Sequence, residues 1–225
     1  LAEEQGVFQW LASKRRHRCL IRQINNPLAG TDDTLLGLIG IGCHDQKAFG
    51  FASCDRLLNS DEGTDVLIQK KEKRGYAYCL TNIEYTNLPQ RKIHEFPDKP
   101  GSPFSRYPAN TNILFAHIPT VRKILRVCPI PGQLINMKST APTLDAEGHS
   151  VLMPAARLES TMQNIADFII SRFPSRLRSK EHPALLKTFI VYNERSKTIS
   201  TTKKTYRRGE STLGKPEQAY YDLLS

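Results

Sequence analysis

The sequence predicts an α/β fold with a mixed sheet, and three observations lead to this class. Short β-rich runs alternate with segments of helical spacing along the 225 residues, which favours α/β over all-α architecture. A β-rich run at 18–24 leads through turn-forming residues into a helix, and in open α/β sheets such loops lie where ligands bind. A length of 225 residues is sufficient to bury one sizeable core, so we expect one domain or at most two.

The first half of the chain predicts two helices and four strands. Runs rich in β-branched and aromatic residues, bounded by Gly, Asn or Pro, indicate the strands, and capping residues before apolar periodic segments indicate the helices. We expect a helix at 6–11, a strand at 18–24, a helix capped by Thr31 or Asp32 and running through Ile41, a strand at 49–54, and a β-hairpin of strands 65–70 and 76–85.

The second half begins with a stretch at 88–108 that holds five prolines and no sustained apolar period, so we expect a mobile loop there. Beyond it the same rules predict two strands and three helices. These are a strand at 112–118, a short helix at 119–124, an amphipathic helix with Leu158, Met162, Ile165, Phe168 and Ile169 on one core-facing stripe, a strand at 187–193, and a last helix opened by Pro216.

The net charge of +10 predicts an anionic partner, and Lys and Arg are concentrated at 14–18, 70–74, 172–180 and 197–208. Nucleic acid, anionic lipid and phosphorylated small molecules all carry the required charge, and a solvated face is the alternative for the first two runs. A nucleic-acid-binding module needs aromatic residues among the cations, and the last run, 197–208, holds only Tyr206. We therefore expect phosphorylated small molecules and no nucleic acid.

Cysteine and histidine usage excludes two classes of site. The five cysteines are odd in number and irregularly spaced, and the six histidines are scattered, so we expect neither a disulfide framework nor a structural zinc site.

The longest apolar stretch, 35–43, is far shorter than the roughly 20 residues of a membrane-spanning helix, and we expect no membrane partner. The chain opens on Leu1 without Met, from which we expect that it was cut from something longer.

Nine blocks of the sequence, in order, carry a family resemblance: 6–10, 22–26, 38–42, 50–54, 83–85, 108–114, 157–167, 173–176 and 190–195. Together they resemble the UDP-glucose pyrophosphorylase superfamily, especially the plastid-type branch associated with sulfolipid synthesis and its bacterial relatives. The resemblance implies a Rossmann-like nucleotidyltransferase (sugar pyrophosphorylase) domain. The family's Gly-rich phosphate loop and Gly-His-Gly segment are absent. Residues 1–225 are therefore expected to be the sugar-binding portion of a catalytic domain whose N-terminal part is missing, and to be inactive alone.

The implied reaction is attack of a sugar-1-phosphate, preferably glucose-1-phosphate, on the α-phosphorus of UTP, giving UDP-glucose and pyrophosphate with Mg²⁺ as cofactor. Such chemistry depends on in-line positioning and on cations that neutralise phosphoryl oxygens. Cytosolic relatives place a metal-binding Asp where this chain has Asn25, and Mg²⁺ prefers carboxylate oxygen. Asp32 and Asp33 are nearby but are equally explained as helix caps, so the metal ligands stay unassigned. A catalytically silent relative that only binds nucleotide sugar is the alternative. The relatives occur in bacterial cytoplasm and plastid stroma.

The resemblance also implies a set of site residues. Amide side chains can donate and accept hydrogen bonds at once, as sugar hydroxyls require. Plain turns, sheet-edge salt bridges and a solvated basic loop are the alternative explanations for its members. The expected substrate-binding residues are Gln23, Asn25, Asn26, Glu84, Asn110, Thr111, Asn112 and Glu159, and the expected catalytic residues are Lys203 and Lys204.

Overall fold

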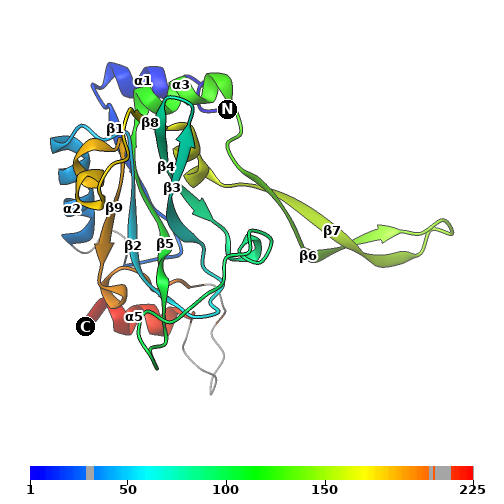
Figure 1. The fold of residues 1–225 in the computed structure, drawn as a ribbon. Helices are drawn as coiled ribbons and strands as arrows, with labels where there is room; N and C mark the ends of the chain where they lie inside the picture. The colour runs from blue at the N-terminus through cyan, green and yellow to red at the C-terminus, as the bar shows by residue number, and fades with distance from the viewer. Residues whose placement is uncertain (29–32, 203–204, 206–213, 225) are drawn as a thin grey trace.

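The computed structural model describes residues 1–28, 33–202, 205 and 214–224, and its centre is a seven-stranded sheet (Figure 1). The strands are β1 (Arg18–Ile21), β2 (Phe49–Leu57), β3 (Thr64–Glu72), β4 (Gly75–Ile83), β5 (Phe104–His117), β8 (Ser171–Phe173) and β9 (Thr188–Asn193). Their order is β8-β4-β3-β5-β2-β9, with β1 paired to β5. The pair β2 and β9 is parallel and the other pairs are antiparallel, so the predicted mixed sheet is confirmed.

Five α-helices surround the sheet in the described residues: α1 (Val7–Ser13), α2 (Asp33–His44), α3 (Ile118–Val127), α4 (His182–Leu185) and α5 (Pro216–Leu224). Four 3-10 helices, η1 (Tyr85–Asn87), η2 (Met162–Phe168), η3 (Ser179–Glu181) and η4 (Arg195–Lys197), complete these elements. The predicted opening helix, second helix, hairpin, short helix after β5, late strand and final helix are all confirmed.

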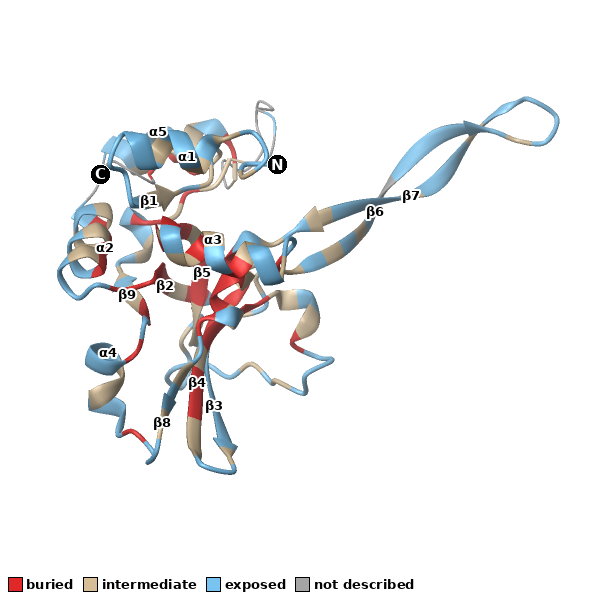
Figure 2. Ribbon diagram, turned by 90° about the horizontal axis from the view of Figure 1, so that it is seen from above, coloured by how far each residue is buried: buried red, intermediate tan, exposed pale blue. Residues whose placement is uncertain are grey.

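Side-chain alternation along β5 divides the core between the two faces of the sheet. Leu114 and Ala116 pack in one cluster with buried residues of α3 and η2, whereas Ile113 and Phe115 pack in another with Leu38 of α2. Strands expose successive side chains to opposite faces, so one strand serves both clusters. The buried residues gather on β2, β4, β5 and η2 (Figure 2). The backbone of β5 is therefore fixed from both sides.

A separate two-stranded arm, β6 (Gln133–Leu144) paired with β7 (Ser150–Ser160), projects from the body of the molecule (Figures 1 and 2). It corrects the predicted amphipathic helix. Leu158 lies in β7 and is 64% exposed, and the following turn is the 3-10 helix η2, where Phe168 is 45% exposed. Only Ile165 and Ile169 of the predicted stripe are buried. Pairing with β6, which the sequence did not indicate, holds the chain extended through Ser160 and overrides the helical spacing.

The predicted loop at 88–108 is too long, because β5 already begins at Phe104. Phe104 pairs with Leu57, which extends the strand into the proline-rich stretch. The remaining stretch is anchored by an ion pair between Glu95 and the buried guanidinium of Arg56. Its mobility stays a prediction.

No helix within the described residues is long and apolar enough to cross a membrane. All five cysteines are free, and Cys54 is buried. Burial raises the pKa of the Cys54 thiol to about 12, so this sulfur stays protonated and unreactive at neutral pH.

Candidate functional site

The candidate site lies at one edge of the sheet, where three strands end together. Strands β1 and β2 both run antiparallel to β5, and β2 runs parallel to β9, so the carboxyl ends of β1, β2 and β9 point the same way. The segment 23–26 follows β1, and Cys54 near the end of β2 lies between Ala109 of β5 and Asn193 of β9. Ligands of open α/β sheets bind at such carboxyl edges.

The predicted Asn-Thr-Asn triplet forms a β-bulge in β5 at this edge. Ala52 pairs with Ile113 but Ser53 pairs with Asn110, so Thr111 and Asn112 have no partner in β2. The φ angle of Asn112 is +57°, a left-handed conformation that Asn adopts more readily than most residues. Such bulges occur next to active sites, where they change the direction of a side chain.

Hydrogen bonds within the triplet fix the shape of the bulge. Asn110 Oδ1 accepts from the Asn112 backbone N–H at 3.0 Å, and Asn110 Nδ2 donates to Asn112 Oδ1 at 3.0 Å. The Thr111 hydroxyl donates to the carbonyl of Ala52 at 2.7 Å, which satisfies an acceptor that the bulge would otherwise leave unpaired. Asn110 and Thr111 are buried, and Asn112 is half-buried. Asn112 is therefore the member of the triplet best placed to contact a ligand.

A buried carboxyl group, Asp65 of β3, lies beside the bulge, and sequence reasoning missed it. Ser53 Oγ donates to Asp65 Oδ2 at 2.6 Å, and Asn82 Nδ2 donates to Asp65 Oδ1 at 3.2 Å. Burial raises the pKa of Asp65 to about 7, with a smaller contribution from the charge of Glu84, although both hydrogen bonds act in the opposite direction. This carboxyl therefore titrates near neutral pH. The signal in the sequence was a charged residue at the start of an otherwise β-rich run.

Direct contacts join the carboxyl network to the bulge. The Asn110 backbone N–H donates to the carbonyl of Gly63 at 2.9 Å, and Thr64 Oγ1 donates to the carbonyl of Pro108 at 2.7 Å. A Cβ atom at Gly63 would lie 2.9 Å from Asn82 Nδ2, so a side chain there would displace the Asn82 amide. The turn before β3, the Asp65 network and the bulge thus form one packed unit.

The predicted residue Glu84 lies next to this unit. Gln163 of η2 donates to Glu84 Oε1 at 3.1 Å, and the charge of Glu84 raises the pKa of Asp65. Asn164, the next residue of η2, donates to the carbonyl of Asn82 at 3.4 Å. The segment η2 therefore covers the site from the side of β4.

The predicted residues Asn25 and Asn26 connect the loop after β1 to the segment after β9. Asn26 is 2% exposed; its Nδ2 donates to the Thr198 carbonyl at 2.9 Å and its Oδ1 accepts from Ser200 N–H at 2.9 Å. The Asn25 backbone carbonyl accepts from Thr202 N–H at 2.8 Å, and Asn25 Nδ2 donates to the Thr202 carbonyl at 3.3 Å. The Oδ1 atom of Asn25 is buried and has no hydrogen-bond partner in the described part of the chain.

The other predicted residues are placed differently. The Gln23 carbonyl accepts from Asn26 N–H at 3.1 Å, which closes the turn after β1. Glu159 lies on β7 rather than on a helix, where it accepts from Asn136 Nδ2 at 3.0 Å and Arg157 Nε at 2.8 Å. Lys203 and Lys204 lie outside the described residues.

Two arginines brace the turn that follows β2. Arg195 donates to both carboxylate oxygens of Glu62, at 2.6 and 3.0 Å, and to the carbonyl of Asp55 at 2.7 Å. Arg56, 1% exposed, donates to the carbonyls of Ser60 and Glu62 at 2.8 and 2.9 Å. Such bidentate, charge-assisted contacts fix geometry as well as adding stability. They hold the chain between the ends of β2 and β3, where the site begins.

The described residues include no group of three or more His, Cys, Asp or Glu side chains that could hold a metal ion. The unpartnered Oδ1 of Asn25 is an amide oxygen, a weaker ligand for Mg²⁺ than a carboxylate. Within the described residues, this side of the site thus offers a magnesium ion one amide oxygen and no cluster of carboxylates.

The mixed sheet with helices around it and a polar bulge at its carboxyl edge agrees with the Rossmann-like α/β fold that the sequence predicted. Solved structures agree in fold. A point mutant of UDP-glucose pyrophosphorylase from Leishmania major, in complex with UDP-glucose, superposes with a TM-score of 0.56 at 16% identity, covering 89% of this chain and 38% of that one. Another point mutant of the same enzyme, also in complex with UDP-glucose, gives a TM-score of 0.53 at 17% identity with the same coverage. No family model matches the chain.

In sequence, the chain is 38% identical over 231 residues to the chloroplastic UTP–glucose-1-phosphate uridylyltransferase 3 of Arabidopsis thaliana. The match covers 100% of this chain and 26% of the relative's own length. The resemblance to the UDP-glucose pyrophosphorylase superfamily that the nine blocks predicted is therefore confirmed, and the chain corresponds to about a quarter of such a protein.

Proposed function

We propose that the complete protein transfers a uridylyl group from UTP to glucose-1-phosphate, giving UDP-glucose and pyrophosphate. The observation that carries the proposal is the 38% identity, along the whole chain, to a plant UTP–glucose-1-phosphate uridylyltransferase. The polar bulge at the carboxyl edge of the sheet supports it, because it offers amide groups where a sugar ligand would lie. The chloroplastic relative favours plastid stroma as the compartment.

In this proposal the described residues bind and orient the sugar nucleotide. Asn112 hydrogen-bonds the sugar hydroxyls, while Asn110 and Thr111 hold the bulge in shape. Glu84 and Glu159 stay candidate contacts at the border of the site. Asn25 and Asn26 fix the backbone of 198–202, and Lys203 and Lys204 are the proposed source of positive charge for the transferring phosphoryl group.

Magnesium belongs to the proposal as a companion of UTP. The ion would neutralise charge on the phosphate oxygens, as in other phosphoryl transfers. We propose that Asn25 Oδ1 contacts the ion, because this buried oxygen has no hydrogen-bond partner within the described residues. The binding of UDP-glucose by Asn112 does not depend on this contact.

The experiment measures both activity and affinity in the full-length protein. Formation of UDP-glucose from UTP and glucose-1-phosphate with Mg²⁺ tests the enzyme, and calorimetric titration with UDP-glucose tests the pocket. We expect Asn112→Ala to weaken UDP-glucose binding by about 1 to 3 kcal/mol, the usual effect of leaving a buried polar partner unpaired. If UDP-glucose binds but no turnover occurs, the protein is the catalytically silent relative.

Two matched variants separate the Asn112 side chain from its backbone. Asn112→Gly removes the amide but suits the left-handed backbone, so it should lose the same affinity. Asn59→Ala carries the same backbone cost at φ +58° in an exposed turn, and should keep the parent affinity. Parent-like binding by Asn112→Gly would show that backbone strain, and not a ligand contact, explains the Ala variant.

A further inference from the structure

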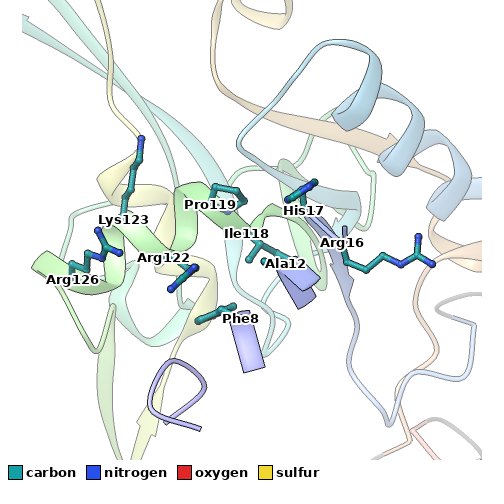
Figure 3. A pocket seen from close by; sticks show the side chains of 9 residues that line it. All are labelled: Phe8, Ala12, Arg16, His17, Ile118, Pro119, Arg122, Lys123 and Arg126. Carbon is teal, nitrogen blue, oxygen red and sulfur yellow. The ribbon is translucent and has the colours of Figure 1, made fainter. Parts of the chain in front are cut away.

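A pocket of about 160 Å³ lies between helices α1 and α3, away from the candidate site (Figure 3). Its apolar lining comes from Phe8 and Ala12 of α1 and from Ile118 and Pro119 at the start of α3. Arg122 lies beside Phe8 in Figure 3, and its guanidinium carbon is 5.8 Å from the centre of the Phe8 ring. The pocket can therefore hold an apolar group of about the size of an aromatic ring.

Five basic side chains complete the lining: Arg16, His17, Arg122, Lys123 and Arg126. No acidic residue is among the lining residues in the described part of the chain. The nearby Glu3 is already engaged, because Arg122 Nε donates to its Oε2 at 2.8 Å and holds the pKa of that carboxyl below its usual value. Arg16, Lys123 and Arg126 are exposed, so their charges face solvent around the opening.

The pKa of His117, the last residue of β5, is lowered in part by the same group of positive charges. Burial lowers the pKa of His117 first, and the charges of Arg18, His17 and Lys123 lower it further. The surface around α1 and α3 therefore favours an anion.

The pocket is separate from the site at the bulge. Arg18 pairs with His117 at the amino end of β1, so the pocket lies at the strand ends opposite to the carboxyl edge. Six residues of extended chain separate Asn112 from Ile118, or about 20 Å at 3.3 Å per residue. A ligand in this pocket would not touch the Asn-Thr-Asn triplet.

We propose that the pocket between α1 and α3 binds a small phosphate monoester whose organic group is apolar. The phosphate lies on the α3 side of the opening, where Lys123 and Arg126 extend, and the apolar group contacts Phe8, Ala12 and Ile118. Bare phosphate would leave the apolar lining in contact with water. A neutral hydrocarbon would leave the basic residues without a counter-charge. This binding site is additional to the proposed uridylyl transfer and does not depend on it.

The test uses the full-length protein and phenyl phosphate as the probe, with inorganic phosphate and benzyl alcohol as partial ligands. We expect calorimetry to show phenyl phosphate binding more tightly than either partial ligand, and weakening as salt rises. Ala12→Leu fills the apolar part at an exposed helical position that tolerates Leu. Lys123→Gln with Arg126→Gln removes two charges at the opening.

Each of these variants should weaken phenyl phosphate binding by about tenfold or more, which corresponds to about 1.4 kcal/mol. The control, Lys70→Gln with Lys71→Gln, removes the same charge from exposed positions of β3 and should stay within about twofold of the parent. Three results would overturn the proposal. They are no phenyl phosphate binding, equal binding of inorganic phosphate, or an equal loss in the control. Binding to anionic lipid vesicles without phenyl phosphate binding would assign the surface to membranes instead.

Discussion

Asp65→Asn is the most informative single change, because Asp65 combines complete burial with a pKa near neutral. Asn has nearly the same shape and can accept the hydrogen bond that Asn82 donates, and the Ser53 hydroxyl can rotate to accept from the new amide. The variant therefore removes the titration and keeps most of the packing. Its effect should appear in the pH dependence of stability.

The magnitude follows from the difference between the two pKa values. In the unfolded chain Asp65 ionises near 3.8, whereas in the folded protein it stays protonated up to about pH 7. Between these values the folded state binds the extra proton, so the free energy of unfolding falls as pH rises. The decrease has a limiting slope of about 1.36 kcal/mol per pH unit. From pH 5 to pH 7 it amounts to about 2 kcal/mol, and it levels off above the folded pKa.

The assay is urea unfolding of parent and Asp65→Asn at half-unit steps from pH 5 to pH 8. We expect the variant to gain about 2 kcal/mol relative to the parent between pH 5 and pH 7. Asp61→Asn, at an exposed position in the preceding turn, controls for loss of one surface charge and should follow the parent. Parallel pH profiles for parent and Asp65→Asn would show that Asp65 does not titrate in this range.

Three further changes test the packing around the site and its proposed catalytic lysines. Arg56→Met leaves Glu95 without its buried partner and should cost about 3 to 5 kcal/mol of stability in urea unfolding, and a loss below about 1 kcal/mol would contradict the buried ion pair. Asn26→Ala leaves two backbone groups unpaired and should cost about 1 to 3 kcal/mol in the same assay, so unchanged stability would exclude this structural role. Lys203→Ala with Lys204→Ala in the full-length enzyme should lower kcat by about 10²-fold to 10³-fold at saturating UTP, with partial rescue by Arg. A kcat within about threefold of the parent would make this segment a solvated loop.

Local signals explain which elements could be predicted from the sequence. The hairpin of β3 and β4 depends on a turn at Gly75 between two β-rich runs, and both features are visible within a short window of sequence. The junction of β5 and α3 depends on a buried run that ends at Pro119, near the helix start, where Pro is favoured. Because these features depend on neighbours in sequence, the predicted and observed positions of the hairpin turn and of the strand–helix junction agree closely.

The arm shows where local reasoning failed. Residues 158–169 contain apolar side chains at helical spacing, but Glu159 pairs with Leu134 and Leu158 with Ile135 across the arm. Cross-strand pairing is a tertiary interaction, and it decides the conformation when local propensities are weak. Nothing within the helical window indicated that a partner strand lay upstream, across the turn of the arm.

The candidate site was predicted in part, through its family resemblance. The resemblance predicted the Asn-Thr-Asn triplet as a substrate contact, which stays a prediction, and its bulge became visible only when the pairing with Ala52 and Ser53 was known. The resemblance predicted Asn26 as a substrate contact. In the structure, both polar atoms of its side-chain amide, Nδ2 and Oδ1, form hydrogen bonds with backbone groups. The network around Asp65 joins three strands, so no single segment of the sequence could reveal it.

The excess of positive charge, which composition alone could not assign, divides into groups with different surroundings. Arg56 and Arg195 are used inside the molecule, where carboxylates and carbonyls satisfy their guanidinium groups. The run at 14–18 could have been a solvated face, but α3 places further cations beside it, with an apolar pocket between them. Like charges on two adjacent elements repel one another, and a bound anion would relieve that repulsion. The cationic surface between α1 and α3 is therefore a part of this charge that a small anion can reach together with an apolar pocket, without entering the candidate site.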